Sequence, residues 1–353
     1  MSFDNHTLDI VFGEPMQVAI AVFILALAGT AWFSSRFMPF RVLDAPNERS
    51  LHVGQIPRTG GVAIVVALII GISYLLIRNS LQLPLAIGCG TVLLVSIISF
   101  LDDVYKLAPL FRLSVQVLAA ATAISAGINV SLIHLPGIVY PLPYMFAVVF
   151  TLLFIIWMTN LYNFMDGMDG FAGGMAVLGF SVLGCLGLRA DAIGYAGVCF
   201  AVAAASAGFL IFNFPPARIF MGDVGSSTLG YLVGVLGIWA DREHIAPLWA
   251  TVLIFSPFIV DATITLVRRL LAGEKVWQAH RSHYYQRLVQ AGWGHRRVVL
   301  CEYLVMLAAA GSTVLAVQYS KELVQWIVLL VWIAIYLALA WSVDRIWQAS
   351  LVK

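Results

Sequence analysis

The sequence predicts an all-α, polytopic membrane protein of about eleven membrane-spanning helices, with its functional groups gathered on one face. Of the 353 residues, 61% are hydrophobic and only 11% are charged, whereas soluble domains are about 45–50% apolar and about 25% charged. The mean hydropathy is +0.93. These values exclude a soluble globular enzyme, a disordered chain and a nucleic-acid-binding domain.

Eleven apolar runs approach or exceed the roughly 20 residues that a helix needs to cross a bilayer. A short turn near Arg189 and Asp191 separates the sixth run from the seventh. We expect residues 1–353 to form a single transmembrane domain. In order, the runs are Met16–Phe37, Gly60–Ile77, Pro84–Leu101, Leu110–Gly127, Leu142–Asn163, Phe171–Leu188, Ala192–Phe212, Val224–Ala240, Ala246–Val267, Val298–Tyr319 and Val324–Trp347.

The basic residues predict the orientation in the membrane. An odd number of crossings places the two termini on opposite sides. With the N-terminus outside, sixteen of the twenty Lys and Arg residues fall on the inner side, as the positive-inside rule requires. We therefore expect the cytoplasmic face to carry the five inner connections, which are Phe37–Thr59, Asp102–Pro109, Phe164–Gly170, Asn213–Asp223 and Arg268–Arg297.

Those connections hold most of the residues that could support chemistry, and this convergence predicts a site at the cytoplasmic face. Asp102 and Asp103 end the third run. Adjacent carboxylates repel each other, and a divalent cation or a bound proton would relieve that repulsion. The alternative is a solvated helix end with Lys106 as the counter-ion.

Polar residues recur every three positions at the end of the fifth run, at Asn160, Asn163, Asp166 and Asp169. Their carboxylate and amide oxygens are ligands that Mg²⁺ prefers. The alternative is that they cap the helix or make polar contacts between helices.

Asp223 lies in the segment NFPPARIFMGDVGSS, just before the eighth run begins. The start of a helix offers free N–H groups and a positive dipole end, which favour phosphate. A carboxylate beside such a helix start suits a complex of phosphate with Mg²⁺. The alternative is that Asp223 only caps its own helix.

The longest inner connection contains His280, Arg281, His283 and Arg287. If 276–290 is helical, the two histidines and Arg287 share one face that could bind an anionic leaving group. The alternative is a basic helix that contacts anionic lipid. In the ninth run, Asp261 could form an ion pair with Arg268 or take part in catalysis.

Together these segments resemble the polyprenyl-phosphate N-acetylhexosamine-1-phosphate transferases, the superfamily that includes MraY, WecA, TagO and WbpL. The resemblance lies in DDVYK, NxxNxxDGMDGFAGG, FNFPPARIFMGDVGS and HRSHYYQRL, and it spans about 250 positions. The segment DAPNERSLHVGQIPRTGG favours the WecA and WbpL branch.

The resemblance implies a reaction in which undecaprenyl phosphate attacks a UDP-N-acetylhexosamine and UMP leaves. It further implies Mg²⁺, with Mn²⁺ as a substitute, a bacterial inner-membrane location, contact with membrane lipid, no nucleic acid, a possible homodimer and a role in initiating O-antigen or another surface glycan. The sugar stays open between GlcNAc and 6-deoxy amino sugars such as FucNAc or QuiNAc.

The matching positions imply roles for individual residues. Asp223 and Asp166 match metal-binding positions, and Asp102, Asp103 and His283 match catalytic ones; which of the paired aspartates is base or ligand stays open. Substrate contacts are implied for His52, Lys106, Asn163, Asp169, Asn213, Phe220, His280 and Arg281, with Phe220 expected to stack on uracil. The loop around His283 departs from the family pattern. Related loops often carry further histidines just after this position, where this chain has Tyr284, Tyr285 and Gln286, and His280 stands where some relatives have an acidic residue.

A different class of function, a secondary transporter for an anionic or sugar substrate, is the alternative. Transporters place charged residues near the midplane of the membrane, often within related repeats. The sequence instead gathers its carboxylates at one surface and has no visible repeat, so it favours the transferase.

Overall fold

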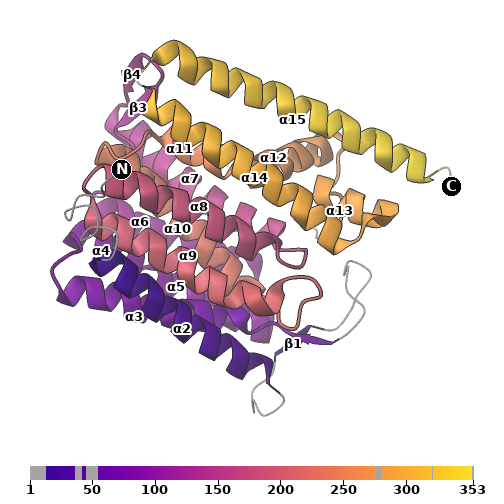
Figure 1. Cartoon of the computed structure of the whole chain (residues 1–353), viewed down its shortest axis with the longest axis horizontal. Helices are drawn as coiled ribbons and strands as arrows, with labels where there is room; N and C mark the ends of the chain where they lie inside the picture. The colour runs from indigo at the N-terminus through magenta and orange to yellow at the C-terminus, as the bar shows by residue number, and fades with distance from the viewer. Residues whose placement is uncertain (1–12, 36–41, 45–54, 276–279, 320, 352–353) are drawn as a thin grey trace, which may run out of the picture.

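The structure, a computed structural model, describes residues 13–35, 42–44, 55–275, 280–319 and 321–351. Its helices run roughly side by side as one elongated bundle (Figure 1). The helices are α2 (Glu14–Ser34), α3 (Gly60–Ile77), α4 (Leu83–Gly90), α5 (Val92–Tyr105), α6 (Pro109–Ser125), α7 (Tyr144–Met165), α8 (Phe171–Arg189), α9 (Ile193–Asn213), α10 (Gly222–Arg242), α11 (Leu248–Ile254), α12 (Ser256–Leu271), α13 (Tyr284–Leu288), α14 (His295–Gln318) and α15 (Glu322–Leu351), with a π-helical turn, η1, at Val289–Trp293.

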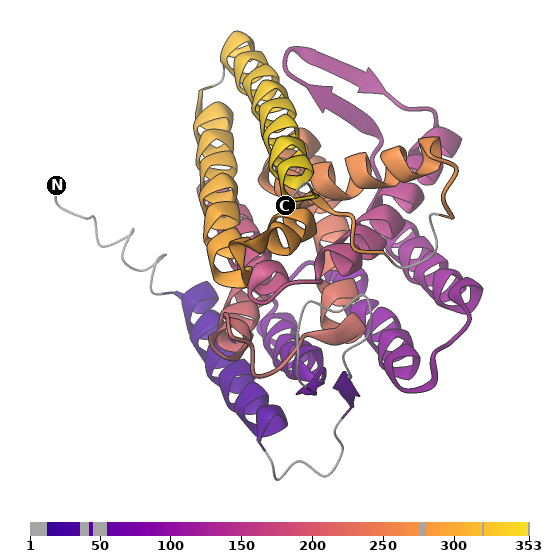
Figure 2. The same cartoon turned by 90° about the vertical axis from the view of Figure 1, so that its right-hand side faces the viewer.

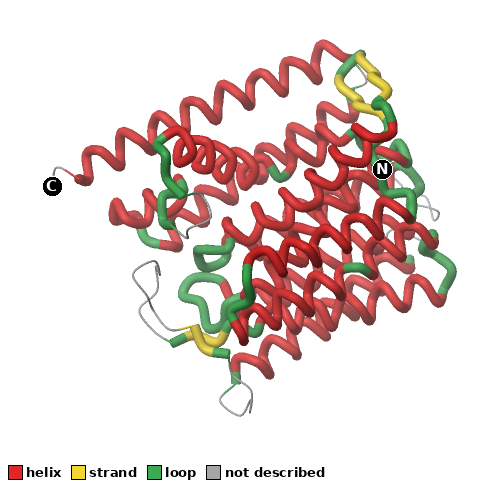
Figure 3. Tube along the Cα trace, turned by 180° about the vertical axis from the view of Figure 1, so that it is seen from behind, coloured by secondary structure: helices red, strands yellow, loops and turns green. Residues whose placement is uncertain are grey.

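Two small antiparallel hairpins lie at opposite ends of the bundle (Figure 3). One pairs β1 (Leu43–Asp44) with β2 (Ile56–Pro57), and the other pairs β3 (Leu132–Leu135) with β4 (Ile138–Pro141). We call the first of these the β1 end. The helix α15 finishes at the β1 end, whereas α2 begins at the opposite end (Figure 1).

The all-α, multi-pass prediction is confirmed. Each of the eleven predicted runs contains helix in the described residues. Eight helices there are long and apolar enough to cross a membrane, or nine if the bent pair α11 and α12 forms one span. Because α6 has only 17 residues and α10 is rich in Gly, Ser and Thr, the count of eleven crossings stays a prediction.

Two predicted runs are broken in ways that the hydropathy pattern does not indicate. The third divides into α4 and α5 at Thr91. The ninth bends by 81° between α11 and α12, where Pro257 stands in the first turn of α12. Proline has no N–H to donate and its ring clashes with the preceding turn, so the helix restarts in a new direction.

The helix α10 lies at the centre of the bundle, with every residue from Val224 to Asp241 buried. A hydroxyl contact of 2.9 Å between Ser96 and Thr228 joins it to α5. Its first turn carries Asp223 and packs against α3, where a Cβ on Gly61 would lie 2.2 Å from the backbone nitrogen of Gly225. The absence of side chains here lets the two backbones touch and fixes the position of Asp223.

We predict that Gly61→Ala destabilises the protein, because the added methyl would overlap α10. Overpacking of this kind lowers the free energy of unfolding by about 1–3 kcal/mol. The matched control is Gly311→Ala in α14, where a Cβ would meet no atom within 4 Å. Thermal unfolding of the detergent-purified variants measures the difference. Equal midpoints for the two variants would show that the contact between α3 and α10 is not tight.

Candidate functional site

The first inner connection and the segment before α10 form one hydrogen-bonded unit at the β1 end, which faces the viewer in Figure 2. The N–H of Phe220 donates to the carbonyl of Pro57 at 2.7 Å, and the N–H of Gly60 donates to the carbonyl of Phe220 at 3.0 Å. The N–H of Gly61 donates to Met221 at 2.8 Å. The backbone of Phe220 is therefore fixed, and its side chain is half-buried.

The paired aspartates lie on the last turn of α5, which continues to Tyr105 rather than ending before them. Asp102 pairs with Arg112, and its Oδ1 accepts the N–H of Leu107 at 2.7 Å. Asp103 pairs with Arg58 at 3.3 Å. The counter-ions are thus two arginines; Lys106, suggested as counter-ion by the sequence, is exposed and ends the helix in a left-handed conformation.

Asp102, Asp103, Asp166 and Asp223 form what we call the carboxylate cluster. Arg112 also reaches Asp223, at 3.4 Å. Asp166 follows the last residue of α7 and interacts electrostatically with both Asp223 and Asp103. Burial, and then the neighbouring carboxylates of Asp223, Asp103 and Asp169, raise the pKa of Asp166 well above its usual value. The sequence prediction that three separate loops bring their carboxylates together therefore agrees with the structure.

The carboxylate cluster has the oxygen donors that a divalent cation prefers, but its side chains are not arranged around a cation position. Among the residues that the structure describes, no three His, Cys, Asp or Glu side chains are arranged to hold a metal ion as they stand. However, Oδ2 of Asp103 is buried without a hydrogen-bond partner, and it faces Gly222 beside Asp223. Oxygen donors crowded in this way suit Mg²⁺. The residues therefore fit a cation that would take over some of the contacts that Arg58 and Arg112 make with the aspartates.

Two of the predicted substrate contacts brace neighbouring loops. Asn213 is 4% exposed; its Oδ1 accepts the N–H of Gly170 at 2.8 Å, and its Nδ2 donates to Ile219 at 2.9 Å. In return, Oδ2 of Asp169 accepts the N–H of Ala217 at 3.0 Å. These reciprocal bonds position the segment that leads to Phe220 and Asp223.

The four polar residues at the end of α7 divide between structure and site. The amide of Asn160 donates to Gln116 on α6 at 2.8 Å, so the helix-contact alternative is correct for this residue. Asn163 donates to Ser227 of α10 at 3.2 Å and also contacts Asp223. Only Asn163 and the residues beyond it face the carboxylate cluster.

The sequence made the shared face of His280, His283 and Arg287 conditional on a helix over 276–290; in the described residues α13 begins only at Tyr284, so both histidines precede the helix. The N–H of His283 donates to the side chain of Gln286, which forms a capping box. Asp261 accepts the N–H groups of Tyr284 and Tyr285 at 3.0 and 3.2 Å. The side chains of Gln286 and Asp261 thus satisfy the free N–H groups at the start of α13, which is why the helix begins at Tyr284.

Asp261 also contacts the imidazole of His283, with 3.1 Å between Oδ1 and Nδ1. Both residues are buried, at 8% and 3% exposure. A carboxylate at Nδ1 places the proton there and leaves Nε2 as the reactive nitrogen. The alternative pairing of Asp261 with Arg268 is wrong, because Arg268 pairs with Asp344 of α15.

His280 and Arg281 have separate surroundings. The ring of His280 lies 4.8 Å from that of His283, and its Nδ1 contacts the hydroxyl of Ser282 at 2.8 Å. Burial, with smaller effects of His283 and Arg269, lowers the pKa of His280 to about 4. Arg281 is exposed. The predicted contact His52 lies outside the described residues, as do 276–279.

Tyr285 connects α13 to the DGMDG loop. A Cβ on Gly167 would lie 2.3 Å from the hydroxyl of Tyr285, so only glycine fits between Asp166 and α13. At the start of α14, His295 contacts Asp169 at 3.2 Å. The segment that carries His280 and His283 therefore lies beside the DGMDG loop, and with the carboxylate cluster it forms one site.

Three residues of this site were not predicted: Arg58, Arg112 and His295. In the sequence, both arginines stand out only as charges that set the orientation. Their signal was available, because both lie in inner connections beside carboxylates that need neutralising. For Asp261 the sequence left open an ion pair with Arg268 or a role in catalysis. Nothing in the spacing indicates that Asp261 would meet His283, which is 22 residues away.

Comparison with known proteins gives one family match and many relatives. The family model described as glycosyl transferase family 4 matches residues 84–241. A probable undecaprenyl-phosphate N-acetylglucosaminyl 1-phosphate transferase of Bacillus subtilis is 31% identical over 267 residues, which is 74% of each chain. A decaprenyl-phosphate N-acetylglucosaminephosphotransferase of Mycolicibacterium smegmatis is 29% identical over 86% of this chain and 84% of its own. An undecaprenyl-phosphate alpha-N-acetylglucosaminyl 1-phosphate transferase of Yersinia pestis is 26% identical over 94% and 92%.

We predict that His280 is uncharged in the folded protein at neutral pH and that it makes the fold less stable as the pH falls. Its pKa is about 4 in the fold and about 6.5 in an unfolded chain. The stability that this difference contributes is present above pH 6.5 and is lost as the pH falls towards 4. Lowering the pH from 7 to 5 should therefore reduce the unfolding midpoint of wild type more than that of His280→Gln. An equal or smaller reduction in wild type would contradict the burial of His280.

Proposed function

Because the chain belongs to glycosyl transferase family 4, we propose that it transfers N-acetylhexosamine 1-phosphate from a UDP-sugar to polyprenyl phosphate. The relatives are named for N-acetylglucosaminyl 1-phosphate transfer to undecaprenyl or decaprenyl phosphate. The observation that carries the proposal is the carboxylate cluster with its two arginines, fixed at the end of the bundle where the loops meet.

The reaction joins an oxygen of the lipid phosphate to the sugar-linked phosphorus of the donor. The bond between that phosphorus and the bridging oxygen of the diphosphate breaks, and UMP leaves with the electron pair. Phosphoryl transfer depends mainly on alignment and charge neutralisation. Arg58 and Arg112, already paired with carboxylates of the cluster, are the cations that we assign to that neutralisation.

Mg²⁺, or Mn²⁺ in its place, is the proposed cofactor. Asp223, Asp166 and Asp103 would hold it, because their oxygens are crowded and one of them is buried without a partner. When bound, such an ion neutralises charge on the diphosphate.

The contacts favour different roles for the paired aspartates. Both oxygens of Asp102 are engaged, one by the N–H of Leu107 and one by Arg112. Asp103 keeps one oxygen without a hydrogen-bond partner. We therefore assign Asp103 to contact the substrate or the cation, and Asp102 to hold Arg112 in place.

His283 is the proposed donor to the departing UMP phosphate. Asp261 holds its Nδ1, so the ring is oriented and Nε2 can donate when the imidazole is protonated. Preorganised donors of this kind are worth about 2.7–4 kcal/mol in the transition state. Of the predicted contacts around the sugar nucleotide, Phe220, Asn163 and Lys106 remain candidates, whereas Asn213 and Asp169 act as braces.

The proposed orientation places the β1 end in the cytoplasm, where nucleotide sugars and the lipid phosphate of the inner leaflet are both accessible. The product would begin a bacterial surface glycan, of which O-antigen is one. A secondary transporter is the competing function, and it requires uptake of an intact substrate.

The test is UMP release by the purified protein supplied with Mg²⁺, undecaprenyl phosphate and a panel of UDP-sugars that includes GlcNAc, FucNAc and QuiNAc. We expect UMP and a lipid-linked sugar diphosphate in equal amounts, and neither product without the lipid phosphate. Uptake of an intact UDP-sugar into vesicles without release of UMP would refute the transferase and support the transporter.

We predict that Asp223→Asn reduces UMP release by about 100-fold or more, because it removes a charge that neutralises the transition state. The matched control is Asp191→Asn, the same exchange at an exposed turn between α8 and α9. Asp191 has a φ of 54°, which asparagine also tolerates. Near-normal turnover by Asp223→Asn at limiting Mg²⁺ would remove this residue from the site.

A further inference from the structure

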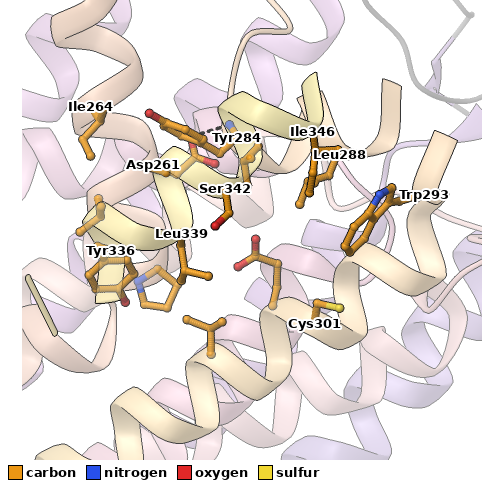
Figure 4. Close-up of a pocket in the computed structure, with 16 residues that line it drawn as sticks. Asp261, Ile264, Tyr284, Leu288, Trp293, Cys301, Tyr336, Leu339, Ser342 and Ile346 are labelled. Atoms are coloured by element: carbon orange, nitrogen blue, oxygen red, sulfur yellow. Dashed lines mark hydrogen bonds between the residues drawn. The ribbon is translucent and has the colours of Figure 1, made fainter. Parts of the chain in front are cut away.

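At the β1 end, the apolar packing of the last helix comes from side chains that are only partly buried, among them Val343 and Ile346. In α15 only Trp332 is buried. A pocket of about 280 Å³ lies between α15 and the helices beneath it, α12 and α14. Leu339, Ser342 and Ile346 of α15 line this pocket together with Asp261 and Cys301 (Figure 4). A polar attachment adds to this partial packing at the end of α15.

Asp344 supplies that attachment. Its two oxygens accept from both terminal nitrogens of Arg268, at 3.0 and 2.7 Å. Oδ1 also accepts from Arg287 at 2.8 Å. Both guanidinium groups lie over the ring of Tyr284, at 5.1 and 5.4 Å. One carboxylate on α15 thus neutralises two cations that share one aromatic ring.

The network continues to the residue before His283. Nε of Arg287 donates to the carbonyl of Ser282 at 2.9 Å, and the N–H of Arg287 donates to the carbonyl of His283 at 2.9 Å. A charged side chain with several fixed partners is oriented more strongly than one with a single partner. Two hydrogen bonds therefore connect Asp344 to Ser282, one from Arg287 to Asp344 and one from Arg287 to the carbonyl of Ser282. Through this link Asp344 acts on the neighbouring residue, His283.

We propose that Asp344 of α15 is a positioning residue for His283. By pairing with Arg268 and Arg287 it holds the backbone at Ser282 and so fixes the imidazole between Asp261 and the substrate. Without the Asp344 carboxylate, the guanidinium groups of Arg268 and Arg287 over the ring of Tyr284 repel each other. Arg287 is then held less firmly against the carbonyl of Ser282, just before α13. The inference rests on the proposed function, in which His283 donates to the departing UMP.

The experiment is a double-mutant cycle on UMP release. Asp344→Asn is combined with His283→Ala, and kcat and KM for the UDP-sugar are measured in all four proteins. We expect Asp344→Asn to lower kcat by about tenfold, a typical effect between coupled neighbours, while KM changes by less than about twofold. In the His283→Ala background the same substitution should have no further effect.

The control is Arg345→Gln, which changes a charge on the next residue of α15, where Arg345 lies over Trp341. It should leave kcat within about twofold of wild type. A kcat for Asp344→Asn equal to that of the control, or an equal fractional loss in both backgrounds, would overturn the proposal. Absence of UMP release by wild type would instead refute the proposed function.

Asp344→Glu separates positioning from folding. It keeps the charge but moves the carboxylate by one methylene. If Asp344→Asn does not accumulate as folded protein, Asp344→Glu takes its place in the cycle. A loss of kcat by Asp344→Glu that disappears in the His283→Ala background supports the proposal, and a loss that persists there refutes it.

Discussion

Repulsion between carboxylates at the end of an apolar bundle is the constraint on which this structure depends. Asp102, Asp103, Asp166 and Asp223 come from three segments and interact with one another. Charges removed from water are costly unless opposite charges meet them. Arg58 and Arg112 do so here, and a divalent cation would do so more completely. The small residues between α3 and α10, and the braces at Asp169 and Asn213, hold the groups together against that repulsion.

Contacts with other parts of the fold also hold the segment of the site that carries His283. His283 caps α13, a helix of only five residues, which is too short to be stable by itself. Asp261 and Gln286 satisfy its first N–H groups, and the hydroxyl of Tyr285 lies against Gly167. A segment with little intrinsic stability is thus fixed by contacts with α12, the DGMDG loop and α15.

The sequence was sufficient for whatever follows from composition and local pattern. Apolar runs located the helices, and the predicted orientation placed Asp102, Asp166 and Asp223 at one end. It was insufficient where geometry decides. Hydropathy does not indicate the 81° bend beside Pro257, and no periodicity predicts that Asp261 meets His283 or that Arg268 pairs with Asp344. These pairs depend on how separate helices cross, which residue spacing within one helix does not encode.

Binding of Mn²⁺, followed by electron paramagnetic resonance on the purified protein, tests the central claim most directly, because it requires no turnover. We expect a single Mn²⁺ site per chain, from which Mg²⁺ displaces the bound Mn²⁺. Asp166→Asn should weaken that site by about tenfold or more, whereas Asp191→Asn at the opposite end should leave it unchanged. Equal Mn²⁺ binding by wild type and Asp166→Asn, or none by wild type with UDP-sugar present, would contradict the account.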